Sequence, residues 1–406
     1  MVAGVVLAGC GGIGTSSGPA SSAAPGPGRS PAPSSLPARS ASPAQPGAAG
    51  TTECATAPAR QALLGLGPGA LTGVQFVSAR QGWAAGAGQI LATTDGGAHW
   101  TTQDRGALDL TSLDFISGAA GWAVGTGALL TTSDGGARWT ALPRACPGIR
   151  AVHFVSPSVG VAVAGGTGIT LYGGAAPQVG GVVLATSDGG RSWRRLAAPA
   201  DAQSVCLNDP AHGWLGADGR LYRTADDGRT WTLAAPGVRP FHPADPATMV
   251  VQCAGDSAWA LDIGPGAASS QMPHIGYHAG PAGTAAIFAE QYFPHPGASA
   301  PADSPGAYPG TLSALSAAAA VYIDYCPACG YGTAPWALAT GNGASLAREG
   351  NVGDLNVPVA ASFLTPAQGW VVGSVFDQRN PSERTWRIVA TSDGGRTWRT
   401  GYSSAP

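Results

Sequence analysis

The sequence contains no lysine, and all 21 of its basic residues are arginine. Charged residues make up 11% of the 406 residues, against roughly 25% in an average soluble domain. This shortage disfavours long helices and coiled coils, which are rich in Glu and Lys. No basic block or stripe stands out, so we expect no nucleic-acid partner. No apolar run reaches the roughly 18 residues of a transmembrane helix, so we expect no spanning segment.

Glycine and proline are abundant instead, with 62 and 34 residues. Together they form nearly a quarter of the chain, where about 12% is usual. The formal net charge is −2. Such a composition favours many short strands joined by tight turns, together with some disordered sequence.

The first ten residues look like a targeting signal. Leu7-Ala8-Gly9-Cys10 resembles a bacterial lipobox, in which small residues precede a cysteine that receives a diacylglycerol. Residues 1–10 are too short for a full signal peptide and lack a basic start, so we expect that the true translation start lies upstream. The resemblance implies a lipidated Cys10 and an extracytoplasmic protein anchored to the bacterial cell membrane.

A linker follows this signal. Ala, Gly, Pro, Ser or Thr occupy 35 of the forty positions 11–50, without one aromatic or acidic residue. Such a segment cannot bury enough apolar surface to offset its ordering entropy. We therefore expect a disordered tether over 11–53 and a folded domain over 54–406.

Six cysteines remain when Cys10 is set aside, and an even count outside the cytosol suggests three disulfides. Sequence alone leaves their connectivity open. The pairs that we expect are Cys54–Cys146, Cys206–Cys253 and Cys326–Cys329.

A Thr-x-Asp-x-Gly-x-x-Trp pattern occurs five times. Its aspartates are Asp95, Asp134, Asp188, Asp226 and Asp393. Asp accepts hydrogen bonds from the amides of its own turn, and Gly supplies a positive φ. The flanking Thr and Trp suit strands, so the pattern predicts a hairpin.

A second pattern precedes the first, because an apolar strand is followed after seven residues by a Gly-Trp strand, as from Phe76 to Trp83. One unit therefore reads as a four-stranded antiparallel meander. Successive Asp turns lie 39, 54 and 38 residues apart, and a period near 40 with four strands per unit indicates a β-propeller.

These units resemble the BNR/Asp-box repeats of sialidase-type propellers and of photosystem II assembly-factor propellers. The resemblance implies an all-β, seven-bladed propeller of four-stranded antiparallel blades, although six or eight blades remain possible. Between Asp226 and Asp393 no box occurs, and two degenerate units fit there. The expected blades are 72–104, 111–143, 149–198, 203–236, 248–294, 310–347 and 355–402.

Insertions gather in the turns between second and third strands, on the face opposite the Asp boxes. They are roughly 165–181, 265–277 and 376–386. Loops on a rigid scaffold often carry binding residues. The candidate ligand-binding residues are Tyr172, Asp377, Arg379, Asn380, Glu383, Arg384 and Trp386.

Catalysis is the alternative. A sialidase-type exo-glycosidase would need a Tyr nucleophile with a Glu partner, an acidic Asp and three Arg. The sequence has four Glu, no recognisable Arg triad, and no Arg between Gly69 and Phe76. The Asp-box carboxylates are accounted for by their own turns, so we interpret them as structural and expect no catalytic residue.

Cys326-Pro-Ala-Cys329 could indicate redox chemistry or zinc, but its strand-rich context favours a structural disulfide. His274 and His278 have a metal spacing only on a helix, which Pro273 and Gly276 oppose, so we place them in a loop. We expect no metal and no cofactor.

The sequence thus predicts a lipid-anchored, monomeric binding or scaffold propeller. Its partner would be a glycan, a small molecule or an envelope protein. An assembly chaperone similar to the photosystem factors is a further alternative, which a broad concave Arg-rich patch would favour.

Overall fold

The structure is a computed structural model of the chain. It describes residues 69–125, 127–142, 148–165, 181–234, 248–264, 274–283, 285–291, 308–325, 334–340, 345–377 and 380–404. The chain divides into two units, Met1–Ala49 and Gly50–Pro406, and every described residue belongs to the second. The tether expected over 11–53 and the first ten residues lie outside the described residues.

The described residues form strands and turns that make five four-stranded antiparallel sheets and one sheet of six strands. The six-stranded sheet consists of β1 (Leu71–Phe76), β2 (Gly82–Thr93), β3 (Thr101–Phe115), β4 (Gly121–Gly125), β5 (Ala128–Thr132) and β6 (Thr140–Ala141). The next two sheets are β7 (Ile149–Phe154), β8 (Gly160–Ala164), β9 (Val182–Thr186) and β10 (Arg194–Arg195), then β11 (Ala202–Leu207), β12 (Gly213–Ala217), β13 (Arg220–Thr224) and β14 (Thr232–Leu233).

Three further sheets complete the chain. They are β15 (Thr248–Ala254), β16 (Ser257–Ile263), β17 (His274–Ala279) and β18 (Ala285–Gln291); β19 (Tyr308–Ser316), β20 (Ala319–Tyr325), β21 (Pro335–Thr340) and β22 (Ser345–Asn351); and β23 (Val357–Thr365), β24 (Gln368–Asp377), β25 (Asn380–Thr391) and β26 (Arg399–Ser403).

The six-stranded sheet is two blades joined end to end. The first part of β2 pairs with β1 and its second part pairs with β3, which in turn pairs with β4 from Leu110 onward. The fourth blade has two strands, β12 and β13, where the first blade has β2. A turn at Gly219 (φ 61°) separates them, and Gly88 (φ 69°) occupies the equivalent position within β2. Both turns need a left-handed backbone that glycine adopts without cost.

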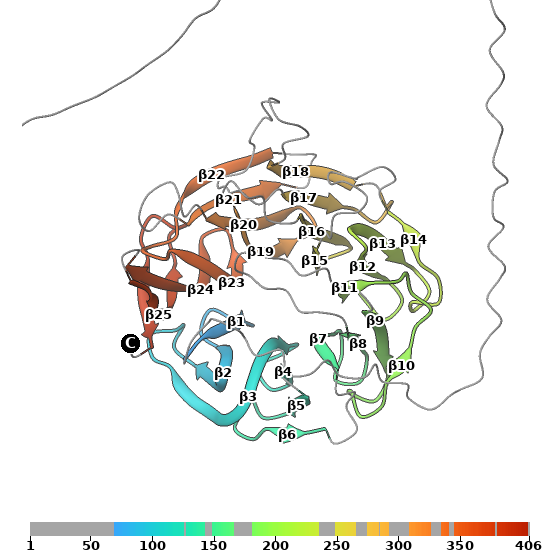
Figure 1. The fold of residues 1–406 in the computed structure, drawn as a ribbon, viewed down its shortest axis with the longest axis horizontal. Coiled ribbons are helices and arrows are strands. Elements are labelled where there is room, and N and C mark those ends of the chain that lie inside the picture. Colours follow the sequence, from blue (N-terminus) through green and yellow to red (C-terminus); the bar gives the residue numbers. More distant parts are fainter. Residues whose placement is uncertain are drawn as a thin grey trace, which may run out of the picture. The chain divides into compact units, whose positions relative to one another are not determined.

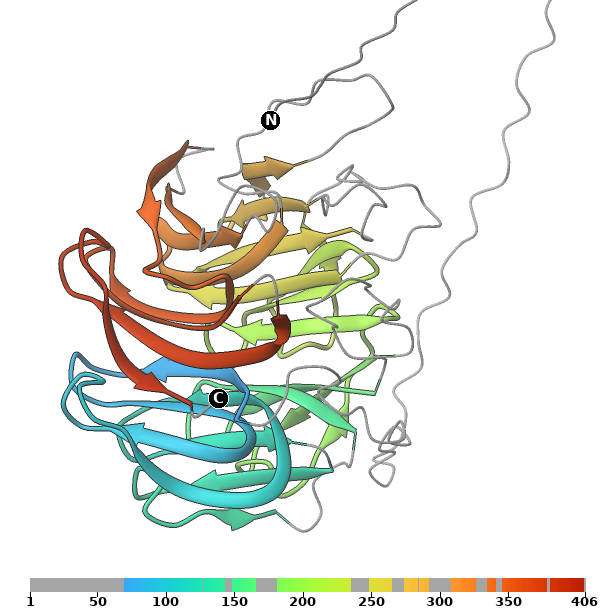
Figure 2. The same ribbon diagram turned by 60° about the vertical axis from the view of Figure 1, so that its left-hand side comes forward.

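The fold is therefore a seven-bladed β-propeller of four-stranded antiparallel blades, as the sequence predicts. Figures 1 and 2 show the blades as a ring, with β1, β7, β11, β15, β19 and β23 innermost. Blades are numbered 1 to 7 in chain order below. In blade 5 a turn without the Asp box joins the third and fourth strands, and the Gly283 amide donates to the Gly280 carbonyl there at 2.9 Å.

Aromatic side chains build the core between adjacent blades. Trp83 of blade 1 stacks on Phe115 of blade 2, and Trp122 of blade 2 stacks on Phe154 of blade 3, each at 3.6 Å between ring centroids. The glycine before each Trp has a steric reason, because a Cβ on Gly82 would lie 2.6 Å from the Phe76 ring. The Gly-Trp pair thus lets one strand pass closely over the Phe of the strand beside it.

The ring closes without a strand shared between its two ends, because all four strands of blade 7 come from the C-terminal part of the chain. Trp370 of blade 7 instead stacks on Phe76 of blade 1 at 3.5 Å and donates its indole N–H to the Gly96 carbonyl at 2.9 Å. Ring closure therefore depends on the same contacts that join blades 1, 2 and 3. Within the described ranges, no helix has the length and apolar character to cross a membrane.

One covalent bond joins two blades. Cys206 on β11 and Cys253 on β15 form a disulfide with 5.7 Å between their Cα atoms, which confirms one of the three expected pairs. The other four cysteines lie outside the described residues, so their pairing stays a prediction.

Removing this bridge should destabilise the propeller. A Cys206→Ala/Cys253→Ala variant frees a loop with a sequence separation of 47 residues in the unfolded chain. We expect the free energy of unfolding to fall by about 2–4 kcal/mol. Urea unfolding without reductant measures this, and an unchanged midpoint relative to the wild type would contradict it.

Candidate functional site

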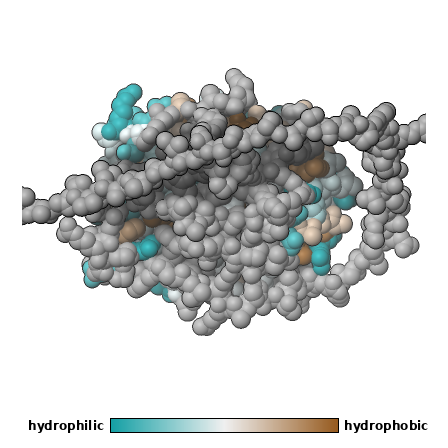
Figure 3. All heavy atoms as spheres, turned by 45° about the horizontal axis from the view of Figure 1, so that its top comes forward, coloured by the Kyte–Doolittle hydropathy of each residue, from teal (hydrophilic) through white to brown (hydrophobic). Residues whose placement is uncertain are grey.

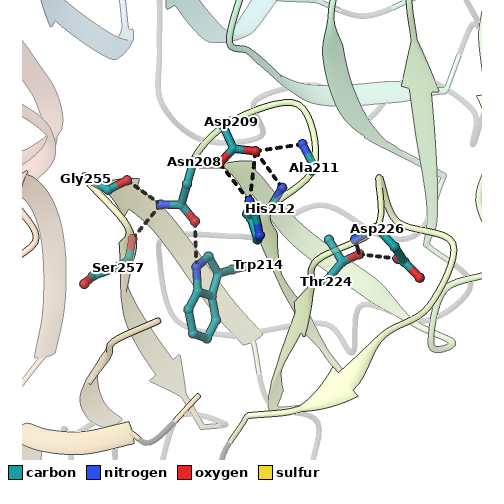
Figure 4. Close-up of polar contacts among 9 residues, drawn as sticks. All are labelled: Asn208, Asp209, Ala211, His212, Trp214, Thr224, Asp226, Gly255 and Ser257. Carbon is teal, nitrogen blue, oxygen red and sulfur yellow. Dashed lines mark hydrogen bonds and ion pairs between the residues drawn. The ribbon is translucent and has the colours of Figure 1, made fainter. Parts of the chain in front are cut away.

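The five Asp boxes share one pattern of hydrogen bonds around the box Thr and the Oδ1 atom of the box Asp. In blade 4, Thr224 Oγ1 donates to Asp226 Oδ1 at 2.9 Å and accepts from the Gly228 amide at 3.0 Å. Oδ1 also accepts from the Thr230 amide at 2.9 Å, while Oδ2 accepts from the Thr230 hydroxyl at 2.6 Å. Figure 4 shows Thr224 and Asp226 at this turn. Each oxygen of the carboxylate therefore has a partner within the turn.

The boxes also brace the first turn of their own blades. The residue after each box Asp donates its amide to a carbonyl of the turn between the first two strands, as from Gly96 to Arg80 at 2.8 Å. The hydrogen bonds that each box carboxylate accepts favour the ionised acid, and the pKa of all five carboxyls is lowered against the opposing effect of burial. For Asp393 the hydroxyl and the amide of Thr397 lower the pKa to about 2. The geometry matches a structural role for these acids.

A ring of side chains near the centre links each blade to the next. Each member lies on an innermost strand, directly opposite the Trp or Val of the second strand. We call it the junction ring, and its members are Gln75, Asp114, His153, Cys206, Gln252, Ser313 and Ser362.

Six of the seven junctions use hydrogen bonds to the backbone of the next innermost strand. The Phe76 amide donates to Ser362 Oγ and the Phe363 amide to Ser313 Oγ, both at 2.9 Å. The Phe115 amide donates to Gln75 at 2.7 Å, and the Phe154 amide donates to Asp114 at 2.5 Å. The Leu207 amide donates to His153 at 3.2 Å, and the Ala314 amide donates to Gln252 at 2.9 Å. The seventh junction is the Cys206–Cys253 disulfide.

The ionisable members of the junction ring are therefore engaged in structure. Burial raises the pKa of Asp114, against the opposing effects of His153 and of the Phe154 amide. His153 accepts the Leu207 amide through Nδ1. Apart from Cys206, sequence reasoning did not single out the junction ring. Five of its members share a readable signal, because each comes directly before a Phe or Leu at or near the end of the first strand.

Blades 4 and 5 meet through a different contact, because blade 5 has no Asp box. Trp214 donates its indole N–H to Asn208 Oδ1 at 2.8 Å, and Asn208 Nδ2 donates to the carbonyls of Gly255 and Ser257 at 3.0 Å (Figure 4). In blades 1, 2 and 7 the equivalent Trp reaches a box glycine of the next blade directly. Asn208 therefore links Trp214 through hydrogen bonds to a blade that has no box.

A buried acid at one position of the second strand distinguishes the two blades that lack the box. Asp262 of blade 5 and Asp324 of blade 6 occupy equivalent positions on the second strand, and both are fully buried. The five boxed blades carry Gly or Ala there, namely Gly86, Gly125, Ala164, Ala217 and Gly373. Asp324 faces His274 of blade 5, with 3.6 Å between Oδ2 and Nε2.

Asp262 has no comparable neighbour. Neither of its carboxyl oxygens has a hydrogen-bond partner among the residues that the structure describes. Burial raises its pKa to about 8, so the acid is protonated at neutral pH. The signal for both acids lies in the apolar stretches Leu261-Asp262-Ile263 and Ile323-Asp324-Tyr325.

The predicted binding hairpin lies between β24 and β25 of blade 7. Glu383 is exposed, and the guanidinium of Arg384 lies over the Phe376 ring at 4.9 Å. Trp386 is fully buried in the core beside Phe76 and Trp370, so its ring does not face solvent. Asp377 and Asn380 lie at the ends of these strands, and ligand binding at the hairpin stays a prediction. Tyr172 and Arg379 lie outside the described residues.

The loop assignment of His274 and His278 is wrong. Both lie on β17, where Gly276 between them is accommodated because a strand, not a helix, forms here. His278 Nε2 lies 2.8 Å from the Ala317 carbonyl oxygen, and its ring is 4.4 Å from Trp259. The described residues contain no group of three or more His, Cys, Asp or Glu placed to hold a metal ion.

Arginines gather on the outer rim of blades 3 and 4. Arg194 on β10 forms an ion pair with Asp227 of the next blade at 3.2 Å, which brings the two rims together. We call the exposed group Arg191, Arg194, Arg195 and Arg229 the arginine surface. The carboxylates of Asp188 and Asp226 beside it are held in their boxes. Figure 3 shows another view, in which hydrophilic and hydrophobic residues are mixed over the coloured surface.

Comparison with known proteins agrees with this geometry. The family described as photosynthesis system II assembly factor YCF48 matches residues 60–152, which include the first two boxes. The chain carries a BNR-type propeller repeat. No curated protein matches it.

Solved structures share the propeller fold. YCF48 from Cyanidioschyzon merolae is 16% identical with a TM-score of 0.46, over 72% of this chain and 84% of that one. An ancestral GH74 enzyme is 12% identical with a TM-score of 0.51, over 82% of this chain but only 55% of its own length. At this identity the second likeness concerns the fold of the BNR propeller and not its chemistry.

The buried acid of blade 5 should make the stability of the propeller depend on pH. The folded-state pKa of Asp262 is about 8, against an ordinary value of 3.8, so folding favours the protonated acid. The contribution of Asp262 to stability is then fully present below about pH 4 and is lost as pH rises through 8, by a few kcal/mol. Asp262→Asn should remove this loss.

Urea unfolding at pH 5 and pH 8.5 compares the two proteins. The amide is also buried, so its cost applies at both pH values and cancels in the difference. Equal pH dependence in the wild type and the Asn variant would show that Asp262 is not buried as described.

Proposed function

We propose that this protein is a non-catalytic binding or scaffold propeller of the bacterial envelope, with a protein partner that presents acidic groups. The observation that carries the proposal is the engagement of its central ionisable groups. The Asp-box carboxylates are bonded within their turns, and Asp114 and His153 bind the backbone of the next blade. The exposed charge that is left to contact another molecule lies on the rim.

The arginine surface is the charged feature that best fits a partner. Arg191, Arg195 and Arg229 are exposed on adjacent blades of a rigid ring. Guanidinium groups bind carboxylates through paired hydrogen bonds, and a cluster of them favours an acidic surface. Such a contact gives orientation and a fast encounter without chemistry.

An assembly factor is the second candidate. The family match over residues 60–152 favours it, and so does the arginine surface, since holding an acidic subunit in place needs a rigid basic scaffold. Anchoring through Cys10 belongs to the same proposal, because a tether over 11–53 would keep the propeller near the membrane.

Charge reversal tests the binding proposal. Arg191→Glu/Arg195→Glu/Arg229→Glu should reduce chemical cross-linking to the partner in the producing bacterium about tenfold, because like charges then face each other. Arg194 is left in place to keep its ion pair. The matched control reverses three exposed arginines of blades 1 and 7, Arg80, Arg396 and Arg399. Equal cross-linking by both triple variants, with unchanged melting temperatures, would exclude the arginine surface.

The anchor is tested separately. Cys10→Ser should move the protein from the membrane fraction to the soluble extracytoplasmic fraction, because the serine hydroxyl cannot carry the thioether-linked lipid. Ser16→Ala in the neighbouring tether is the control and should stay with the membrane. If the Cys10 variant also fractionates with the membrane, Cys10 is not the anchor.

A further inference from the structure

The junction between blades 3 and 4 lacks the aromatic contacts that hold blades 1, 2 and 3 together. Val161 takes the place of the Trp on the second strand, and Leu207 takes the place of the Phe that the Trp would stack on. Asp227, with φ of 62°, takes the place of the box glycine that accepts the indole N–H elsewhere. A buried apolar cluster that includes Val161, Leu207 and Leu215 fills the junction in place of the stacked rings, and polar contacts add to it.

The polar contacts across the junction include a backbone hydrogen bond from the Ala202 amide to the Gly181 carbonyl at 3.1 Å and three side-chain contacts. The Leu207 amide donates to His153 Nδ1 at 3.2 Å, and Arg150 donates to the Ala202 carbonyl at 3.1 Å. The third is the Arg194–Asp227 ion pair, whose side chains are 56% and 41% exposed. Ion pairs exposed to this degree contribute little to stability. The inner side-chain hydrogen bonds across the junction are those of His153 and Arg150.

The contact of His153 exists in one charge state only. A backbone amide can only donate, so Nδ1 must offer a lone pair and the ring proton must be on Nε2. Protonation puts a hydrogen on Nδ1 and sets a donor against the Leu207 N–H. Histidine changes charge between about pH 5 and 8, whereas the amides of Gln75 and Gln252 and the hydroxyls of Ser313 and Ser362 do not.

The charged groups nearest to His153 come from two strands. Asp114 on β3 interacts with His153 electrostatically, and Arg150 lies on the same strand as His153. Cys206 on β11 is held in a disulfide, and Val161 on β8 is apolar, so neither residue carries charge. No other titratable side chain of the described neighbouring strands shares this position in the ring.

We propose that His153 makes the junction between blades 3 and 4 acid-sensitive. Protonation breaks the Leu207 contact and loosens blade 4 from blade 3, while the disulfide keeps blade 4 attached to blade 5. The arginine surface spans the loosened junction, so acid also changes the spacing of Arg195 and Arg229. This last consequence rests on the proposed function, whereas the loosening does not.

Hydrogen exchange measured by mass spectrometry on the full chain tests the loosening. After correction for intrinsic exchange, peptides containing Leu207 should exchange about tenfold faster at pH 5 than at pH 7.5 in the wild type, as expected for one lost hydrogen bond. Peptides containing Phe115, whose amide binds Gln75, provide the internal control and should not change. Partner cross-linking is left out of this measurement, so failure of the binding proposal leaves it unaffected.

Two variants separate titration from simple loss of contact. His153→Gln introduces the side chain that the ring already uses at Gln75 and Gln252, and it should keep Leu207 protected at both pH values. His153→Ala should exchange fast at both. An acid-dependent increase that persists in the Gln variant, or its absence in the wild type, overturns the proposal.

A measurement on the wild type covers the case in which neither variant folds. Nitrogen-15 NMR of the histidine rings should show the Nε2–H tautomer for His153 at pH 7.5, with its protonation over the same pH range as the Leu207 exchange. An Nδ1–H tautomer, or a protonation range separate from the exchange change, also overturns it.

Discussion

The structure depends on how one small sheet is joined to the next. Each blade's innermost strand is a sheet edge, and its backbone amides have no partner on that side within their own sheet. The junction ring supplies a partner from the preceding blade at the same position in six cases, and a disulfide joins the blades in the seventh. Strand pairing between the innermost strands would merge neighbouring blades side by side, so single side-chain contacts keep these strands apart and still close the ring.

At two junctions the departures from the repeat occur in matched sets, with changes on both sides of the junction. Where blade 3 has Val161 in place of Trp, the next blade has Leu207 in place of Phe and Asp227 in place of a box glycine. Where blade 5 lacks the box, the preceding blade supplies Asn208 to bridge from Trp214 to Gly255 and Ser257. At these two junctions the residues on both sides differ from the repeat together, so packing is retained although the motif is lost.

The repeat made the fold predictable from sequence. Box positions such as Asp95 and Asp134, and the offset from Phe76 to Trp83, depend on local turn chemistry that every copy repeats. The junction ring was missed because its seven members share a position and not a residue type. His274 was misplaced because the glycine and proline beside it were read as signs of a loop, whereas pairing across β16, β17 and β18 decides the structure there. The buried Asp262 and Asp324 were missed because burial is a property of the packed ring.

The distribution of acids follows from these constraints. In boxed blades the position of Asp262 must be small, because a Cβ on Gly86 would lie 1.9 Å from the Ala70 carbonyl oxygen. Blade 5 pairs β15 with β16 without the register shift that the other blades show there, and Met249 lies directly opposite Asp262. In blade 5 the change of register makes room for a larger side chain, and a protonated acid can occupy it at neutral pH because it carries no charge. Blade 6 keeps the register shift, and its Asp324 instead faces His274 across the junction. At this position of the second strand, loss of the box and a buried acid therefore occur together in blades 5 and 6, whereas the boxed blades keep Gly or Ala there.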